Sequence, residues 1–176
     1  REKIELYPIA VNLSAVQFEH KHLFNNLEHL FDIYKVNPNH LIIEITESTA
    51  MHHIEGSIRT LQRLREMGIR LAIDDFGTGH SSFLYLKNLP VDELKIDRGF
   101  IHELTVGSKD EMILESIVHL AIRLGLVVTA EGVESPLQME ILSRLGCQQL
   151  QGYLLGMPMD VKRLEEFEYT SSTYFN

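Results

Sequence analysis

Six short apolar runs alternate along the chain with longer amphipathic stretches. The runs cover residues 7–12, 41–44, 70–74, 94–95, 127–131 and 149–151. Short apolar runs predict buried strands, whereas apolar residues spaced three and four apart predict helices. Amphipathic spacing predicts helices at 23–34, 54–67, 81–89, 109–124, 136–145 and 160–167. Regular alternation of strands and helices indicates a parallel sheet flanked by helices.

The ends of the predicted strands are polar. The residues that close them are Asn12, Glu44, Asp74 (followed by Asp75), Lys95, Glu131 and Gln151. A doubly wound sheet places its ligand at one switch point, whereas a (β/α)8 barrel collects site residues from the ends of many strands. The pattern therefore favours a TIM-like (β/α)8 barrel, of which this chain supplies about six of the eight βα units.

Boundaries within the chain follow from the same pattern. The barrel domain is predicted to cover residues 1–168, and residues 169–176 are predicted to form a polar tail. The long helix at 109–124 is expected to turn Ile113, Ile117, Leu120 and Leu124 inward, and the last strand to run over 149–155. Because the chain enters its first strand abruptly, we expect two βα units to precede Arg1 in a longer protein.

Composition narrows the possible functions of the 176 residues. The net charge of −9 carries no basic footprint for a nucleic acid polymer. No apolar run approaches the roughly 20 residues that span a bilayer, so no membrane contact is expected from this segment. The single Cys147 excludes an internal disulfide framework and favours a reducing compartment, hence a cytoplasmic location. Upstream segments could still anchor the full protein to a membrane. The nine histidines form no metal-binding pattern.

Acidic and amide side chains with one lysine are typical of a cation-dependent phosphoryl site. Asp74-Asp75 is the sharpest signal, because adjacent carboxylates repel unless cations neutralise them. A solvated turn with a helix-capping aspartate is the alternative. Glu44, between two isoleucines, is either a metal ligand or half of a buried salt bridge. Asn12 is a cap or a ligand, and Lys95 either pairs with an acid or holds a phosphate oxygen and orients a water.

Six ordered motifs then make the chain resemble a known family. They are Val11-Asn12-Leu13-Ser14, Glu44-Ile45-Thr46-Glu47-Ser48, Asp74-Asp75-Phe76-Gly77-Thr78-Gly79, Leu94-Lys95-Ile96-Asp97, Ala130-Glu131-Gly132-Val133-Glu134 and Gln151-Gly152-Tyr153. Together they resemble the EAL domain, the bacterial phosphodiesterase of cyclic di-GMP. The resemblance implies a (β/α)8-like barrel with one antiparallel strand and hydrolysis of cyclic di-GMP to linear pGpG with two Mg²⁺ or Mn²⁺ ions.

The resemblance also assigns roles by motif. It implies that Asn12, Glu44, Asp74 and Asp75 bind metal, and that Lys95 and Glu131 act in catalysis on the attacking water. Gln151, Glu134 and Asp97 are given substrate-binding or supporting roles. Glu47 resembles the glutamate that anchors the loop after Asp75 and links the site to a dimer interface. A homodimer and an upstream sensory or GGDEF-type domain are the implied partners.

Departures from the family keep a second function open. No Glu-Ala-Leu occurs in the chain, so the metal-binding glutamate of that motif is missing here. Smaller departures are His80, Gly99 and Met157. Because loss of one ligand weakens metal binding strongly, we expect little or no turnover by these residues alone. The alternative is a catalytically inactive domain that senses cyclic di-GMP or docks a protein. Another metal-dependent barrel enzyme would need a substrate-side lysine or histidine that the sequence does not show.

Overall fold

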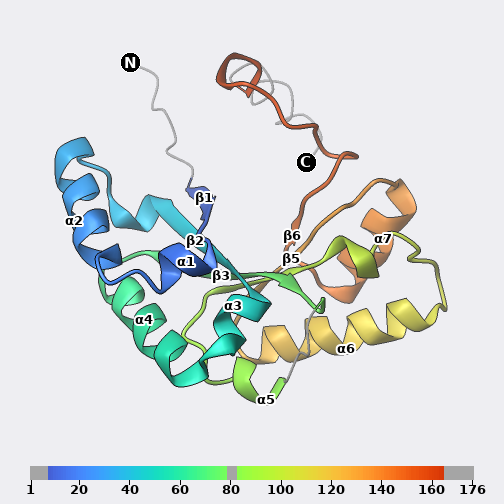
Figure 1. Ribbon diagram of the computed structural model, residues 1–176. Helices are drawn as coiled ribbons and strands as arrows, with labels where there is room; N and C mark the ends of the chain where they lie inside the picture. Colours follow the sequence, from blue (N-terminus) through green and yellow to red (C-terminus); the bar gives the residue numbers. More distant parts are fainter. Residues whose placement is uncertain (1–7, 79–82, 165–176) are drawn as a thin grey trace.

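Six parallel strands form the centre of the molecule (Figure 1). The computed structural model describes residues 8–78 and 83–164. The strands are β1 (Ile9–Asn12), β2 (Leu41–Thr46), β3 (Arg70–Phe76), β4 (Glu93–Ile96), β5 (Val127–Ala130) and β6 (Gln149–Leu150). They lie side by side in the order of the sequence, and every pairing among them is parallel. Sequential order in a parallel sheet is the topology of a TIM-like barrel.

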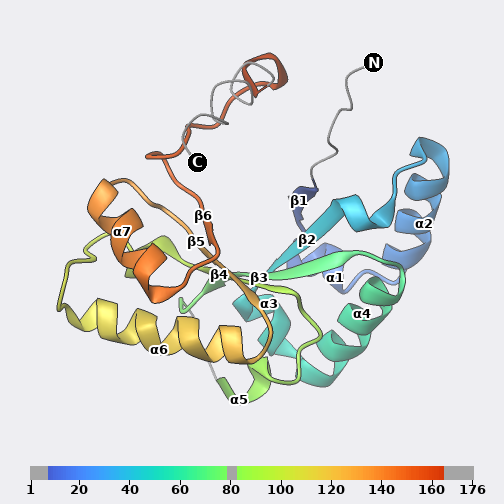
Figure 2. The same ribbon diagram turned by 180° about the vertical axis from the view of Figure 1, so that it is seen from behind.

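The helices lie in an arc around the outside of the curved sheet (Figures 1 and 2). They are α1 (Ala15–Phe18), α2 (Leu23–Tyr34), α3 (Glu47–His52), α4 (Ile54–Glu66), α5 (Phe83–Leu86), α6 (Lys109–Arg123) and α7 (Pro136–Leu145). Two 3-10 helices, η1 (Pro38–His40) and η2 (Arg98–Phe100), precede β2 and follow β4. The predicted fold class is confirmed: the chain forms a curled part of a (β/α)8 barrel.

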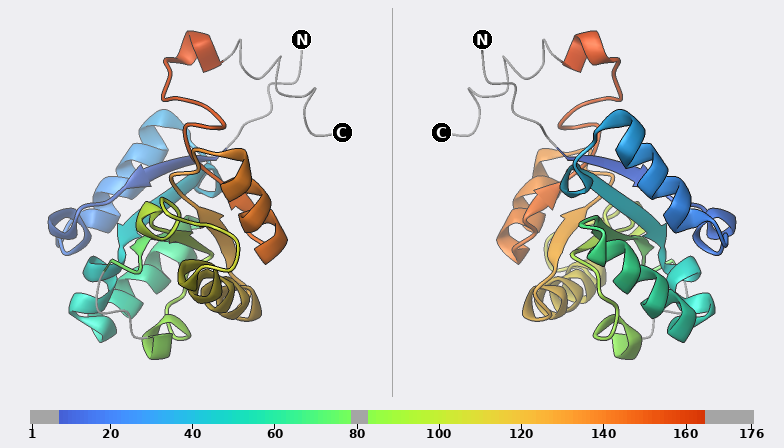
Figure 3. Two further views of the ribbon diagram at one scale, coloured as in Figure 1. Left: turned by 90° about the vertical axis from the view of Figure 1, so that its right-hand side faces the viewer. Right: turned by 90° about the vertical axis from the view of Figure 1, so that its left-hand side faces the viewer.

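The sheet has two edges among the described residues, at β1 and at β6 (Figure 3). All four residues of β1 are exposed, including Ile9 and Val11. The inner strands are buried instead, with Ile45, Ile73, Leu94 and Ile96 almost fully covered. The antiparallel strand implied by the resemblance is not among the six strands that the structure describes.

Local sequence signals explain where the helices begin and end. Ser135 precedes Pro136 and caps α7 with a reciprocal bond to Gln138, and Ser108 caps α6 by accepting from the Glu111 N–H. Serine at the N-cap and proline at the first helical position satisfy or avoid the unpaired N–H groups of a helix start. Gly146 ends α7 in the left-handed conformation with φ of 94°, which glycine adopts without a Cβ penalty.

Two predicted details need correction. The buried face of α6 is formed by Leu114, Ile117, Val118 and Ala121, while Ile113 and Leu124 are exposed. Of the four residues predicted to face inward, Ile117 is buried and Leu120 is half-buried, so the prediction was right only in part, because α6 is apolar over more than one face. Strand β6 ends at Leu150 rather than at residue 155, since residues 153–155 form a turn.

The C-terminal part of the chain is described only to residue 164. Asp160 caps the helical residues 161–164 by accepting from the Arg163 N–H at 2.9 Å. The rest of the predicted helix at 160–167 and the predicted tail at 169–176 lie outside the described residues, as does His80. No helix in the described part of the chain is long and apolar enough to cross a membrane.

Candidate functional site

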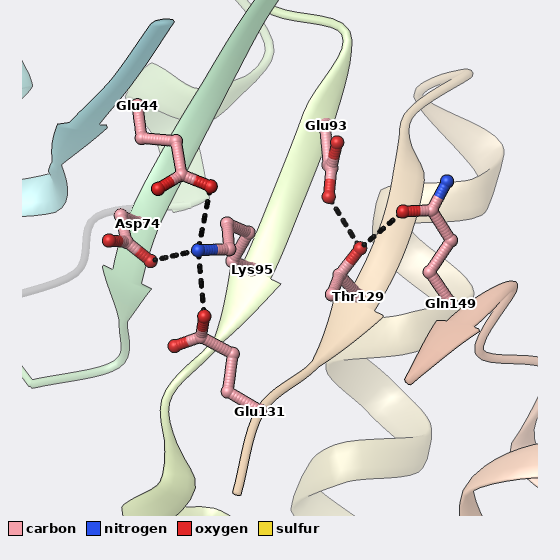
Figure 4. A network of polar contacts seen from close by, with 7 residues as sticks. All are labelled: Glu44, Asp74, Glu93, Lys95, Thr129, Glu131 and Gln149. Carbon is pink, nitrogen blue, oxygen red and sulfur yellow. Dashed lines mark hydrogen bonds and ion pairs between the residues drawn. The ribbon is translucent and has the colours of Figure 1, made fainter. Parts of the chain in front are cut away.

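The polar strand ends converge on the side chain of Lys95 (Figure 4). Lys95 Nζ lies 2.8 Å from Glu44 Oε1, 3.1 Å from Asp74 Oδ1 and 2.7 Å from Glu131 Oε1. These four side chains come from β2, β3, β4 and the residue that follows β5, so the site spans the middle of the sheet. Lys95 is only 5% exposed. Glu44 and Lys95 therefore form the buried ion pair that was one alternative for each of them. The metal-binding role of Glu44 and the role of Lys95 toward phosphate and water stay predictions.

An irregularity in β3 brings Asp74 and Asp75 to the same site. The register of β3 with β4 pairs Ile73 with Leu94 and Phe76 with Ile96, so β3 carries one extra residue there. Asp75 has φ of 54°, which is left-handed and unusual for a residue other than glycine. A bulge of this kind redirects a side chain that would otherwise point to the opposite face. The strand thus continues through both aspartates to Phe76, rather than ending at Asp74 as predicted.

The carboxylates of this cluster fit a divalent cation. Asp74, Asp75 and Glu131 each offer one oxygen, and these oxygens lie within 4.8 Å of one another. Asp74 Oδ1 is buried and accepts no hydrogen bond among the described residues, although Lys95 Nζ is 3.1 Å away outside hydrogen-bond geometry. Carboxylate oxygens are the ligands that Mg²⁺ prefers and that Mn²⁺ also accepts. The residues present therefore match the chemistry of such an ion.

Burial and charge shift the pKa values of the cluster. Burial raises the pKa of Glu131, against the hydrogen bond and charge of Lys95. Burial, followed by the charges of Asp74 and Asp97, also raises the pKa of Asp75. Burial alone would lower the pKa of Lys95, but its hydrogen bonds to Glu131 and Glu44 and the nearby carboxylates raise it above its ordinary value. Lys95 is therefore held as a cation, while two of the acids bind protons more readily than usual.

The segment after Asp75 is tied to α3. Glu47, at the first position of α3, is 2% exposed and its Oε2 accepts a hydrogen bond from the Gly77 N–H at 2.8 Å. Such a bond to a carboxylate is stronger than one between neutral groups. Asp75 O accepts from the Thr78 N–H and from Thr78 Oγ1, which closes the turn. The contact expected of a loop anchor at Glu47 is present.

The other predicted site residues lie around the cluster without joining it. Asn12 pairs in register with Glu44 but is exposed. Asp97 is half-buried and accepts from the Gly99 N–H at 2.8 Å, a distance that a Cβ at residue 99 would disturb. Gln151 and Glu134 are exposed, and no described contact joins their side chains to Lys95 or its acids. Their predicted roles toward a substrate stay predictions.

Comparison with known proteins identifies the family to which this chain belongs. The EAL domain family matches residues 1–158 of the 176. The chain belongs to the EAL domain family. The bifunctional diguanylate cyclase/cyclic di-GMP phosphodiesterase MucR of Pseudomonas aeruginosa is 53% identical over 156 residues, which are 89% of this chain and 23% of MucR. The probable cyclic di-GMP phosphodiesterase PdeA of Escherichia coli is 40% identical over 85% of this chain and 20% of PdeA.

Solved structures of EAL proteins share the fold. A structure of the PaMucR phosphodiesterase in complex with c-di-GMP matches with a TM-score of 0.85 and 52% identity, over 89% of this chain and 64% of that one. Klebsiella pneumoniae BlrP1 with manganese and cyclic di-GMP matches with a TM-score of 0.80 and 28% identity, over 88% of this chain and 40% of that one. The chain spans less than a quarter of the length of the curated relatives named above.

This EAL domain contains a second cluster of polar side chains that the sequence did not predict. Thr129 Oγ1 lies 2.5 Å from Glu93 Oε1 and 3.3 Å from Gln149 Oε1 (Figure 4). Glu93 lies two residues before Lys95 on β4, and Thr129 pairs with Lys95 in register. The alternation of side chains along a strand was the available signal, because Glu93 and Lys95 must share a face. This group links the neighbouring strands β4, β5 and β6 through their side chains.

Proposed function

We propose that this chain is the catalytic domain of a phosphodiesterase that hydrolyses cyclic di-GMP to linear pGpG. The observation that carries the proposal is the Lys95 cluster, in which three acids, from β2, from β3 and from the residue after β5, lie within 3.1 Å of one buried ammonium group. It lies in a fold that matches a phosphodiesterase in complex with c-di-GMP. The predicted substrate, reaction and EAL membership agree with one another.

In this proposal Asn12, Glu44, Asp74 and Asp75 hold two Mg²⁺ or Mn²⁺ ions. Lys95 offsets only one of the carboxylates around it, so the metal-free site is strongly negative and unsuited to a phosphodiester. Bound cations would neutralise these acids, lower the pKa of water and offset charge on the phosphoryl oxygens. Asp74 Oδ1, which is buried and accepts no hydrogen bond among the described residues, and the close oxygens of Asp75 and Glu131 support this assignment.

Lys95 and Glu131 then act on the water and on the phosphoryl group. The ammonium group of Lys95 is held charged, so it donates hydrogen bonds to the water or to a phosphoryl oxygen and stabilises negative charge that builds there. The carboxylate of Glu131, whose pKa is raised by burial, is suited to accept a proton from the water. The water oxygen bonds to phosphorus, the bond from phosphorus to the 3′-oxygen breaks, and the water proton is returned to that leaving oxygen.

The proposed surroundings of the domain follow the family. We propose a homodimer, with the Glu47–Gly77 contact between the site and its interface, and a sensory or GGDEF-type domain elsewhere in the full protein. The relative MucR is named as a bifunctional diguanylate cyclase and phosphodiesterase, which supports the proposal of a GGDEF-type domain. We also propose that the domain lies in the cytoplasm, together with its substrate.

Measuring both the hydrolysis and the binding of cyclic di-GMP distinguishes this enzyme from a catalytically inactive domain that only senses cyclic di-GMP. Glu131→Gln in the whole protein is expected to lower the rate of cyclic di-GMP hydrolysis by about 100- to 10,000-fold while cyclic di-GMP still binds. Glu115→Gln on α6, which is exposed, is the control and should keep the wild-type rate. If the wild-type protein binds cyclic di-GMP but releases no pGpG in Mg²⁺ or Mn²⁺, the sensor is the correct function.

A further inference from the structure

Phe100 of η2 lies directly against the backbone that follows Asp75. A Cβ built on Gly77 would come within 2.1 Å of Phe100 Cε2 and 2.7 Å of Cζ. No side chain larger than hydrogen can occupy that space, so the ring edge packs on the Cα of Gly77. Gly77 itself has φ of 103°, a conformation that strongly favours glycine.

Gly77 is thus held from two directions. The carboxylate of Glu47 accepts its N–H at 2.8 Å, and the ring of Phe100 covers its Cα. A further backbone contact, Asp97 N–H to Phe76 O at 3.4 Å, joins the start of η2 to the same segment. The turn between β3 and residue 78 therefore lies between α3 on one side and η2 on the other.

The position of this turn determines where the Asp75 carboxylate lies. Asp75 is only two residues before Gly77 and has left-handed φ at a bulge. A residue other than glycine in such a conformation is strained, and the conformation persists only where neighbouring structure enforces it. The Thr78 bonds to Asp75 O close the turn locally. Phe76 ties the segment to the sheet, because it pairs with Ile96 and its C=O accepts from the Asp97 N–H. Beyond Phe76, the bond to Glu47 and the packing of Phe100 hold Gly77 in place.

We infer that Phe100 is a positioning residue for the Asp75 carboxylate and acts through Gly77. Without the ring, the turn can move toward the vacated space, the Glu47 bond lengthens, and Asp75 leaves its place beside Asp74 and Glu131. The inference takes from the proposed function that Asp75 binds a metal ion, whereas the packing of Phe100 on Gly77 comes from the structure alone. Phe100 contacts neither metal nor substrate in this account.

Two readouts test the inference in the whole protein. Phe100→Ala should raise the Kd for Mn²⁺, measured by electron paramagnetic resonance, by about 10- to 100-fold, as loss of supporting contacts does elsewhere. In the metal-free protein it should speed hydrogen exchange of the Gly77 amide by about tenfold or more, because local opening becomes easier. Phe100→Leu keeps apolar volume without the flat ring. Its Mn²⁺ Kd and its Gly77 exchange rate should therefore lie between those of the wild type and of Phe100→Ala.

Phe31→Ala on α2 is the matched control. Phe31 is also half-buried and packed on the core, but it lies far along the chain on an outer helix. It should destabilise the fold without changing the Mn²⁺ Kd or Gly77 exchange. A double substitution adds a direct test of the contact, because Gly77→Ala should be less damaging in the Phe100→Ala background, where the ring that the new Cβ meets is absent.

The outcomes separate this inference from the proposed function. If Phe100→Ala keeps the Mn²⁺ Kd within twofold and leaves Gly77 exchange unchanged, Phe100 is only a packing residue and the inference fails, whatever the wild-type activity. If both readouts change but the wild-type protein hydrolyses no cyclic di-GMP, the positioning role stands and the proposed function fails. Additive effects of Gly77→Ala and Phe100→Ala would also overturn the inference.

Discussion

At the scale of single residues, Lys95 shows how burial and charge combine. A lysine that is 5% exposed would normally lose its proton more easily, yet three carboxylates within 3.1 Å raise its pKa. The sequence predicted acids and one lysine at the strand ends. It could not predict that Lys95 would lie between the acids, because that depends on the stagger of β2, β3 and β4.

Lys95→Met should destabilise the metal-free EAL domain by about 3–5 kcal/mol, because it leaves buried acids without their cation. Lys87→Met, at an exposed position, should change the free energy of unfolding by less than about 0.5 kcal/mol. Urea unfolding of both variants measures the difference. Mn²⁺ should restore part of the loss in Lys95→Met. Equal stability of the two variants would mean that the cluster is solvated rather than paired.

Cys147 should be a poorly reactive thiol. Burial raises its pKa to about 11, so its reactive thiolate is scarce at pH 8. Compared with a thiol of pKa 9.0, the thiolate fraction at that pH is lower by roughly 100-fold. Alkylation by iodoacetamide, followed by mass spectrometry, should be slower than in urea-unfolded protein by at least that order. Similar native and unfolded rates would show an accessible, unperturbed thiol.

At the scale of elements, the strand ends were predictable and the bulge was not. Apolar runs and their polar endings located each strand to within a few residues. Asp74 and Asp75 face one site because β3 carries an extra residue and Asp75 has a left-handed backbone conformation. No local sequence pattern predicts either feature. The face of α6 was predicted only in part for a similar reason: Ile117 is buried as expected, but the helix is apolar on more than one side and only packing selects Leu114 and Val118.

Gly152 marks a second close approach between elements. A Cβ there would lie 2.1 Å from Val133 O and 2.2 Å from Val133 N, both backbone atoms. Gly152→Ala should therefore cost about 3 kcal/mol or more, because neither segment can move cheaply. Gly107→Ala also replaces a glycine, at φ of 78°, but meets nothing within 4 Å, and should cost about 1–2 kcal/mol. Thermal unfolding compares the two, and equal costs would contradict the predicted clash.

At the scale of the whole molecule, alternation of strands and helices was enough to predict the barrel class. The sheet order and parallel pairings follow from it, because short crossovers place successive strands side by side. The exposure of β1, including Ile9 and Val11, differs from the buried strand predicted over residues 7–12. Among the described residues β1 is an edge of the sheet, with β2 as its neighbour on one side, and the position of a strand in the sheet is not set by its own sequence.

Mn²⁺ should stabilise the whole domain, and less so in acid. At pH 7.5 an ion that binds only the folded state raises the midpoint of thermal unfolding. The pKa values of Asp75 and Glu131 are raised, so the proposed ligand Asp75 and the neighbouring Glu131 take up protons at a higher pH than ordinary acids. Protons then compete with the metal, and the Mn²⁺-induced shift should shrink between pH 7 and pH 5. A shift that is constant over this range would place the ion elsewhere.

The most direct test of the central claim is the metal dependence of cyclic di-GMP turnover. Purified whole protein would be incubated with cyclic di-GMP in Mg²⁺, in Mn²⁺ and in excess EDTA, and the products separated by chromatography. The account predicts linear pGpG with either ion, none in EDTA, and recovery when metal is restored. Turnover that persists in EDTA, or an absence of pGpG under all three conditions, would contradict it.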